Sequence, residues 1–178
     1  MGSTYNTDIK KCTSLEELDI QYLYFEQTRS EWGRKMDEFI LMKNFQIDAN
    51  EIDWHKATKK AITPLIENGF VKVEYEEALM ENLKRAGSKF IISPYIILPH
   101  ARPEQGVNKN AISVLLLKHS VYYENSREPI RLIVVLASTD SVSHLVMLKK
   151  VAEILNKENN VSDILESETI RELYEKFA

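Results

Sequence analysis

The chain has 178 residues and a net charge of −4, with 44% apolar and 28% charged side chains, a composition typical of a globular domain with its own core. This charge, without any clustered basic run, argues against nucleic acid as the main partner, and the single cysteine, Cys12, excludes an internal disulfide. No apolar run approaches the ~20 residues of a membrane span and residues 1–11 lack a secretory signal, so we expect a cytoplasmic protein without direct membrane insertion.

The pattern of residues in the N-terminal region indicates helical structure. Ser14 and Glu17 have the spacing of a capping box, and apolar side chains follow at roughly helical intervals as far as residue 42. We therefore expect a helix over residues 14–42. Because no motif with a chemical meaning falls in this region, we interpret residues 1–37 as a helical extension or linker and residues 38–178 as the main domain.

Two further helices are expected before any strand. The first begins at Asp53, which can cap it, and stops at Gly69, while Pro64 should kink or break it. The second begins near Tyr75 and stops at Gly87. Both carry apolar side chains at helical spacing, namely Trp54, Ala57, Ala61, Ile62 and Leu65 in the first and Tyr75, Ala78, Leu79 and Leu83 in the second.

The hydrophobic period then changes to that of strands. Four short apolar or β-branched runs, bounded by Gly, Pro, Asn or Ser, predict strands over residues 89–93, 95–98, 111–117 and 130–137. The last two runs are almost continuously apolar. They should therefore be central strands that are buried on both faces.

The chain is expected to end with two helices. Asp140, Ser141 or Ser143 can cap the first, and Ser167 can cap the second. The apolar positions expected along them are Leu145, Leu148, Val151, Ala152 and Leu155 in the first and Ile170, Leu173 and Phe177 in the second. Helices before and after a run of strands predict an α/β layer structure.

Among the four histidines, His100 has the most distinctive surroundings. It follows a predicted strand, and Pro99 and Pro103 stiffen the backbone on either side. An imidazole held in this way, with one nitrogen fixed by a hydrogen bond, presents the other as a nucleophile and suits a phosphoryl carrier. The alternative is a turn histidine that merely fits between two prolines.

His144 is the second candidate, because it lies at the start of a predicted helix. The N–H groups and dipole of a helix N-terminus favour anions, so His144 could add a donor to a bound phosphate, or it could simply pack there. Of the other two histidines, His55 is expected to pack on its helix and His119 to be solvated in a turn. Spacings typical of metal sites, nucleotide-binding loops and α/β-hydrolases are absent from the sequence.

The motif Leu98-Pro99-His100-Ala101-Arg102-Pro103-Glu104-Gln105-Gly106-Val107 is followed downstream by Leu136-Ala137, Asp140, His144-Leu145 and Leu148. Upstream of it lie Asp53-Trp54 with Ala57, Gly69-Phe70-Val71, Tyr75 and Ala78-Leu79-Met80. Together these stretches, over residues 38–178, resemble the EIIA domains of the mannitol/fructose class of bacterial sugar phosphotransferase systems. The ascorbate- and galactitol-like branch is the most similar.

This resemblance implies a fold, a reaction and partners. The fold would be a mixed β-sheet flanked by helices on both faces. His100 would be the phosphorylated residue and His144 the second active-site histidine. The phosphocarrier HPr would be the donor, and the cysteine of a sugar-specific EIIB, which serves the membrane permease EIIC, would be the acceptor. Neither a nucleotide nor a metal nor any other cofactor is expected.

Three points stay open at the level of the sequence. Arg102 could contact phosphate or a partner, or it could be an ordinary solvated arginine. Tyr95 and Ile97 stand where the family usually has small residues, which bears on partner fit. The same domain type also occurs in transcription regulators, where phosphorylation is a signal without sugar transport, and a binding module without phosphoryl chemistry would require both histidines to be coincidental.

Overall fold

The computed structural model describes residues 38–123 and 126–178 of the chain. The extension expected over residues 1–37 lies outside the described residues. The helix expected to continue to residue 42 is not present over residues 38–41, which form a turn and irregular backbone. The reason is a competing interaction, because the carbonyl of Phe39 accepts a hydrogen bond from the N–H of Ile112 at 3.0 Å and the Phe39 side chain is buried.

A mixed five-stranded sheet with the order β1-β4-β5-β3-β2 forms the centre of the fold. β4 runs parallel to β1 and antiparallel to β5, and β3 runs parallel to β5 and antiparallel to β2. The central position expected for residues 111–117 and 130–137 is confirmed. The strands are β1 (Phe45–Asp48), β2 (Ile91–Ser93), β3 (Tyr95–Ile97), β4 (Ala111–Val121) and β5 (Ile130–Ala137).

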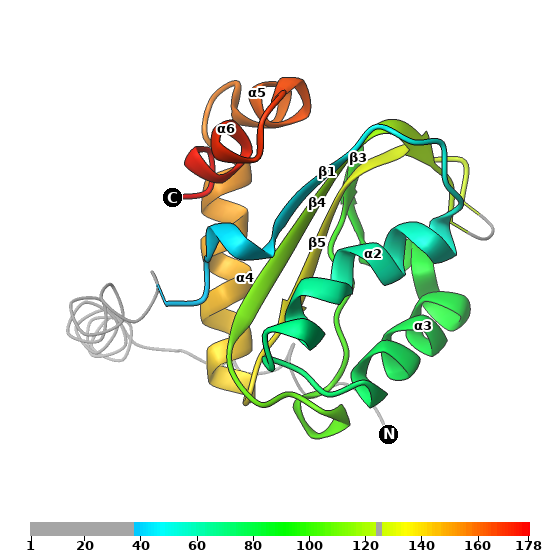
Figure 1. Ribbon diagram of the computed structural model, residues 1–178, viewed down its shortest axis with the longest axis vertical. Helices are drawn as coiled ribbons and strands as arrows, with labels where there is room; N and C mark the ends of the chain where they lie inside the picture. The colour runs from blue at the N-terminus through cyan, green and yellow to red at the C-terminus, as the bar shows by residue number, and fades with distance from the viewer. Residues whose placement is uncertain (1–37, 124–125) are drawn as a thin grey trace, which may run out of the picture. The chain divides into compact units, whose positions relative to one another are not determined.

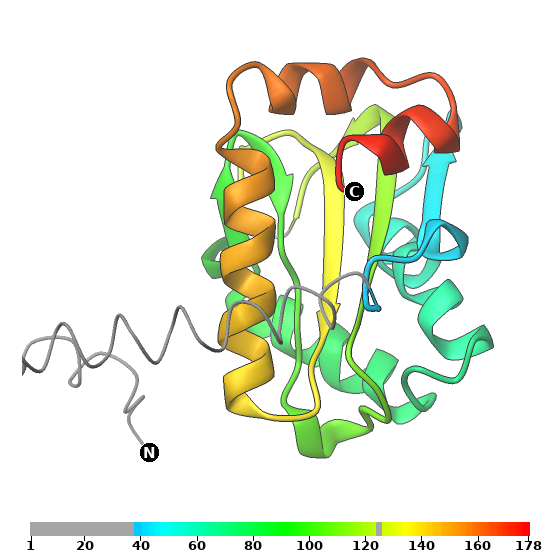
Figure 2. The ribbon, with the colours of Figure 1, turned by 90° about the vertical axis from the view of Figure 1, so that its left-hand side faces the viewer.

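Helices cover both faces of this sheet, as expected (Figures 1 and 2). On one face lie α2 (Trp54–Glu67) and α3 (Glu74–Ala86), followed by the short 3₁₀ turn Gly87–Phe90. On the other face lie α4 (Ser141–Leu155), α5 (Asn160–Glu166) and α6 (Ile170–Glu175). The 3₁₀ turn takes up the first residues of the strand that was expected over 89–93, so β2 starts only at Ile91.

The helix α2 shows how the chain tolerates an internal proline. Asp53 caps its start as expected, and Gly69, at a φ of 71°, lies just beyond its end. The break expected at Pro64 does not occur, since the helix continues to Glu67. Pro64 has no N–H to offer the carbonyl of Lys60, and that carbonyl instead accepts a hydrogen bond from Nε2 of Gln46 in β1 at 2.7 Å.

The helix α4 begins where expected but buries a different face. The Asp140 carboxylate accepts a hydrogen bond from the N–H of Ser143 at 2.8 Å and so caps the helix. The expected core position Leu145 is 56% exposed, and Ala152 is also exposed. The side chains that α4 buries are Ser143, Met147, Val151 and Ile154, of which only Val151 was among the expected apolar positions. The sequence has two apolar stripes along this helix, and only the three-dimensional packing selects one.

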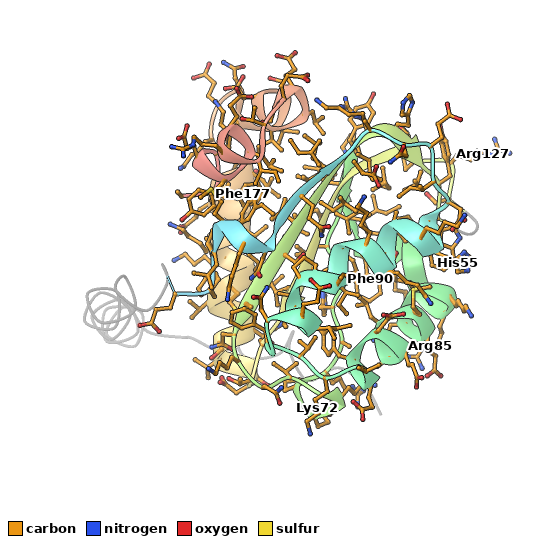
Figure 3. The ribbon with its side chains drawn as sticks, viewed as in Figure 1. His55, Lys72, Arg85, Phe90, Arg127 and Phe177 are labelled. Carbon is orange, nitrogen blue, oxygen red and sulfur yellow. The ribbon has the colours of Figure 1, made fainter. Side chains whose placement is uncertain are left out.

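The expected cap of the last helix was wrong. Ser167 ends α5, which the sequence had not indicated, and its N–H bonds to the carbonyl of Ile164 at 3.2 Å. Thr169 caps α6 instead, by accepting a hydrogen bond from the N–H of Glu172. Leu173 of α6 and Phe177 are buried as expected, and Figure 3 shows Phe177 below α6. The expectation for Ile170 was wrong, because its side chain is 44% exposed.

β3 begins with an unusual backbone conformation. Tyr95 has a φ of 70°, a left-handed value that costs a residue with a Cβ roughly 1–3 kcal/mol. The pairing register shifts between Tyr95 and Ile96, so the strand begins with a bulge. Tyr95 is therefore 41% exposed, whereas Ile97 points into the core and is fully buried. The large side chain at position 97 is thus part of the sheet packing.

The sheet also defines where the candidate site residues gather. β3 and β5 are parallel, so their C-terminal ends meet at one edge of the sheet, where Ala111 at the start of β4 pairs with Ala137 at the end of β5. His100, which follows β3, forms an isolated bridge with Leu136 of β5. The loop after β5 leads directly into α4, so both segments that carry the candidate histidines leave the sheet at this edge.

Candidate functional site

The structure brings His100 and His144 together. Their ring centroids are 4.8 Å apart, and the ring planes are inclined by 60°. His100 is held by its bridge to β5, and His144 lies in the first turn of α4. Residues separated by 44 positions in the sequence thus share one site because β3 and β5 end side by side.

The orientation of the His100 ring shows which of its two nitrogens has a free lone pair. Nδ1 lies 3.0 Å from the backbone carbonyl oxygen of Leu98. A carbonyl oxygen only accepts hydrogen bonds, so Nδ1 carries the proton and Nε2 keeps its lone pair. The edge-to-face packing of Phe90, at 5.0 Å between ring centroids, further restrains the imidazole. The geometry therefore presents Nε2 as a nucleophile.

Burial keeps both rings neutral. The pKa of His100 is lowered by burial, and the hydrogen bond to Leu98 offsets only part of this effect. The pKa of His144 is lowered to about 4, first by burial and then by the proximity of His100. Near neutral pH His100 is therefore a base with a free lone pair, and His144 is an uncharged ring.

A buried hydroxyl orients His144. Oγ of Ser138, a residue only 1% exposed, lies 3.2 Å from Nδ1 of His144. When this hydroxyl donates to Nδ1, the remaining proton of the neutral ring resides on Nε2. His144 can then donate a hydrogen bond to an anion without carrying a charge itself.

Two side chains of α3, which the sequence had not indicated as functional, hold the His100 segment. The Tyr75 hydroxyl donates to the carbonyl of Leu136 at 2.7 Å and accepts from the N–H of Ala101 at 3.0 Å. Asn82 donates from Nδ2 to the carbonyl of His100 at 3.4 Å. The sequence contained one indication of this role, because Tyr75 was expected on the apolar face of its helix. A tyrosine hydroxyl that becomes buried there requires a hydrogen-bond partner.

The two nearby arginines are placed differently. Arg102 is exposed, and its backbone bonds with Gln105 in the turn that follows. No ion pair or hydrogen bond of its guanidinium is found within residues 38–123 and 126–178. Arg85, labelled in Figure 3, donates from Nη2 to Oδ1 of Asn82 at 3.0 Å and is thereby linked to the His100 backbone. Arg102 thus lies two residues from His100 with an exposed side chain.

The N–H groups at the start of α4 are already engaged. The Asp140 carboxylate accepts from the N–H of Ser143, and hydrogen bonds to the backbone of Ser143 and Val142 and to side-chain hydroxyls lower its pKa. Because Asp140 engages the N–H groups of Ser143 and Val142, the expectation that the helix-start N–H groups bind phosphate stays a prediction. The side chain of His144 remains the donor at this helix start that faces His100.

An exposed apolar surface borders the second histidine. Val142 and Leu145, on either side of His144 along the helix, are 61% and 56% exposed. Large apolar side chains that cluster on a surface beside a reactive group are typical of a protein-binding site. Within the described residues, no group of three or more His, Cys, Asp or Glu side chains could hold a metal ion. In the same part of the chain, no helix combines the length and apolarity that a membrane crossing needs.

The part of the chain that holds the sheet and both histidines matches a known family. Residues 38–178 match the family model described as "Phosphoenolpyruvate-dependent sugar phosphotransferase system, EIIA 2". The chain therefore belongs to the EIIA type-2 family of sugar phosphotransferase systems. The family expected from its motifs is confirmed.

Relatives whose names specify different substrates, mannitol and ascorbate, are similar to this chain. It is 29% identical over 121 residues to the mannitol-specific cryptic phosphotransferase enzyme IIA component of Escherichia coli (strain K12), which covers 68% of this chain and 82% of the relative. It is 31% identical over 115 residues to the ascorbate-specific PTS system EIIA component of Mycoplasma pneumoniae, covering 64% of this chain and 72% of the relative.

The solved structures agree with the fold. The solution structure of the Escherichia coli mannitol-specific cryptic enzyme IIA matches with a TM-score of 0.72 and 27% identity, over 80% of this chain and 96% of that one. The crystal structure of IIA mannitol from Escherichia coli matches with a TM-score of 0.66 and 19% identity, over 76% and 96% of the two chains. The fold class expected from the sequence is thus confirmed.

Proposed function

We propose that this protein is a phosphocarrier that accepts a phosphoryl group from phospho-HPr on Nε2 of His100 and passes it to the cysteine of a sugar-specific EIIB. The observation that supports this most is the state of His100. Its neutral ring donates Nδ1–H to Leu98 and presents the Nε2 lone pair next to His144. A neutral, fixed imidazole is the form that attacks phosphorus.

The transfer consists of two displacements. In the first, Nε2 of His100 forms an N–P bond while the N–P bond of the donor histidine breaks, and the donor ring recovers its lone pair. In the second, a cysteine thiolate of EIIB forms an S–P bond while the N–P bond at His100 breaks, and Nε2 recovers its lone pair. Such transfer depends mainly on positioning and on stabilising the charge of the phosphoryl oxygens.

The role proposed for His144 follows from its geometry. It lies beside His100, stays neutral and has Nδ1 next to a hydroxyl that can donate to it. Its Nε2–H can therefore meet a phosphoryl oxygen without competing as a second nucleophile. Arg102 is proposed as a mobile cation that contacts the phosphate or a partner, since its guanidinium is exposed close to His100 in the chain.

The partners are proposed from the family and from the surface. One solved relative with this fold, at 17% identity and a TM-score of 0.66, is a complex of enzyme IIAMtl with phosphorylated enzyme IIBMtl. The exposed apolar pair Val142 and Leu145 gives this chain a contact surface next to its own histidines. We propose the same kind of transient, cytoplasmic complexes here, with HPr and EIIB in turn and the permease EIIC served indirectly.

A second candidate function is a regulatory domain that is phosphorylated as a signal. A likeness in fold to the nitrogen regulatory protein IIA-Ntr from Neisseria meningitidis, at 15% identity and a TM-score of 0.67, makes this alternative worth testing. Both functions require phosphorylation of His100. Only the transport function requires rapid onward transfer to an EIIB cysteine.

The test is a reconstituted relay. The full chain is incubated with enzyme I, HPr and phosphoenolpyruvate, and its intact mass should increase by one phosphoryl group. The adduct should be labile to acid and stable to alkali, as an N-linked phosphate is. Addition of a cognate EIIB should then discharge it. A chain that takes up no phosphate would overturn the phosphocarrier proposal, and one that is phosphorylated but not discharged by EIIB would favour the regulatory role.

We also propose that residues 38–178 form the EIIA domain and that residues 1–37 are an extension outside its chemistry. Both candidate histidines and the motifs around them lie after residue 38. A chain that begins at Glu38 should therefore fold and accept phosphate at the rate of the full chain. A folded but unphosphorylated product would instead assign residues 1–37 a role in docking the donor.

A further inference from the structure

The hydrogen bonds around His100 depart from those of a regular parallel ladder. In a regular parallel pair, Leu136, which lies opposite His100, would donate its N–H to the carbonyl of Pro99. The carbonyl of Leu136 would in turn accept a hydrogen bond from the N–H of Ala101. The first bond is present, from the N–H of Leu136 to the carbonyl of Pro99 at 3.2 Å. The second is replaced, because the N–H of Ala101 donates to the Tyr75 hydroxyl, which in turn donates to the carbonyl of Leu136. A tyrosine hydroxyl is thus inserted into the ladder one residue after His100.

We propose that Tyr75 is a positioning residue of the phosphoryl transfer, whose hydroxyl sets the distance between the His100 backbone and β5. The inference rests on the function proposed above and adds a determinant of its geometry. Leu136 lies two residues before Ser138, the partner of His144. One hydroxyl therefore links the His100 segment to the strand end that leads to His144.

The surroundings of Tyr75 suit a permanent spacer. The side chain is fully buried, and burial raises its pKa to about 12, so the hydroxyl keeps its proton at any physiological pH. The donated bond to Leu136 is therefore always available. Further along the same loop, the N–H of Lys72 bonds to the carbonyl of Gly106 at 2.8 Å, and a Cβ at Gly106 would lie 3.4 Å from the Tyr75 backbone nitrogen. At Gly106, the loop after His100 therefore contacts the backbone of Lys72 and Tyr75, at the start of α3.

Removing the hydroxyl has a defined consequence. In Tyr75→Phe, the N–H of Ala101 and the carbonyl of Leu136 lose their shared partner. Either both groups remain buried and unpaired, or they bond to each other directly. A direct bond would span about 2.9 Å, whereas the two groups are now joined by two successive bonds of 3.0 and 2.7 Å through the hydroxyl. The second outcome draws the His100 backbone towards β5. A displacement of about 1 Å at a reacting group can cost on the order of 10²-fold in rate.

Tyr123 provides a matched control. It is also buried, at 2% exposed, and its hydroxyl is bonded to a single group, Oγ1 of Thr58, at 2.9 Å. It packs against Trp54 of α2 and follows the end of β4 that is remote from His100. Tyr123→Phe therefore removes a buried, hydrogen-bonded tyrosine hydroxyl away from the reacting groups. A merely structural role for Tyr75 predicts that the two variants behave alike.

The experiment compares Tyr75→Phe, Tyr123→Phe and wild type as full chains. Single-turnover phosphorylation by phospho-HPr is measured at several donor concentrations, under conditions where circular dichroism shows each variant to be folded. Tyr75→Phe should reduce the maximal transfer rate at least about tenfold with little change in the concentration for half-maximal rate, and Tyr123→Phe should leave both unchanged. Equal rates for Tyr75→Phe and wild type would overturn the proposal, as would equal losses in both variants.

A second measurement separates this inference from the proposed function. Long-range ¹H–¹⁵N spectra report the tautomer and titration midpoint of each imidazole whether or not the protein accepts phosphate. Tyr75→Phe should shift the His100 and His144 ring signals, and Tyr123→Phe should leave them at their wild-type positions. If wild type takes up no phosphate, the phosphocarrier proposal is wrong, and these spectra alone decide whether Tyr75 positions His100. Unchanged ring signals in Tyr75→Phe would then exclude that role.

Discussion

The four histidines fall into two pairs with opposite surroundings. His55 and His119 are on the surface, with side chains 44% and 53% exposed, and each has Nδ1 within 4 Å of a carboxylate, on Asp53 and Glu51 respectively. His100 and His144 are partly buried, contact each other and form no ion pair within the described part of the chain. The ring nitrogens of the second pair face a backbone carbonyl and a hydroxyl in place of a carboxylate.

This difference in surroundings bears on which imidazole can act as a nucleophile. Burial without a nearby carboxylate favours the neutral form of an imidazole. Only the neutral form has the lone pair that attacks phosphorus. In the transfer that we propose, the same burial that leaves His100 available for attack also prevents His144 from being a cation, so hydrogen-bond donors would meet the phosphoryl charge.

The largest effect is expected at His100 itself. His100→Ala should take up no phosphate from phospho-HPr, because the only nucleophile of the site is gone. Its fold should be retained, since the residue lies in a loop after β3 and is not part of the apolar core. His119→Ala is the control and should be phosphorylated at the wild-type rate. Intact mass spectrometry decides, and labelling of His100→Ala at the wild-type rate would show that another residue carries the phosphate.

A smaller loss is expected at His144. His144→Ala should slow both phosphorylation and onward transfer by about 10²–10³, the typical cost of losing one preorganised donor to a transition state. His144→Gln keeps a donor and should recover part of that loss. His100 should remain the labelled residue in both variants. The comparison requires single-turnover rates of equally folded proteins, and a wild-type rate in His144→Ala would show that this ring merely packs, with Arg102 the next donor to test.

The exposed apolar surface beside the site should affect partner binding more than chemistry. Leu145→Glu places a charge on this surface, next to His144, and should raise the donor concentration needed for half-maximal rate by about tenfold, with the maximal rate nearly unchanged. Ile170→Glu is the matched control. Ile170 is also an exposed apolar residue in a first helical turn, at 44%, but α6 lies at the other end of α4 (Figure 2). Equal effects of the two variants would show that the surface around Leu145 is not a docking site.

The fold could be predicted where the sequence carries long, unambiguous patterns. The continuous apolar runs of β4 and β5 indicated their central position, and Asp53 and Gly69 marked the ends of the segment that holds α2. The four-residue β1 and the seven-residue α5 are too short for a period to be read. The buried face of α4 was misjudged because its two apolar stripes differ only in what packs against them.

The site was predictable only in part, and for a related reason. His100 and His144 stand in recognisable local motifs, so both could be chosen as candidate site residues without a structure. The hydroxyls that position them could not, because Tyr75 acts on Ala101 and Leu136 across separations of 26 and 61 residues. Likewise, only the structure shows that the Asp140 carboxylate engages the first N–H groups of α4.

The smallest expected effect is on stability, and it tests the neutrality of the buried pair directly. The pKa of His144 in the folded protein is about 4, compared with an ordinary value of 6.5, so between these pH values the unfolded chain binds more protons than the folded one. Stability should therefore be full above about pH 6.5 and should fall as the pH is lowered towards 4. Because the ring is only partly buried and solvent screens part of the effect, we expect a loss of about 1 kcal/mol.

His144→Gln removes this ionisation and should lose less of its free energy of unfolding between pH 7 and pH 4.5 than wild type does. The pKa of His100 is shifted in the same direction, so a smaller decline should persist in the variant. Carboxylates whose pKa values lie below their ordinary range, such as that of Asp140, contribute at still lower pH and equally in both proteins. Urea denaturation at the two pH values measures each difference. An equal decline in His144→Gln and wild type would mean that His144 is not held neutral by the fold, and its role as an uncharged donor to the phosphoryl group would have to be abandoned.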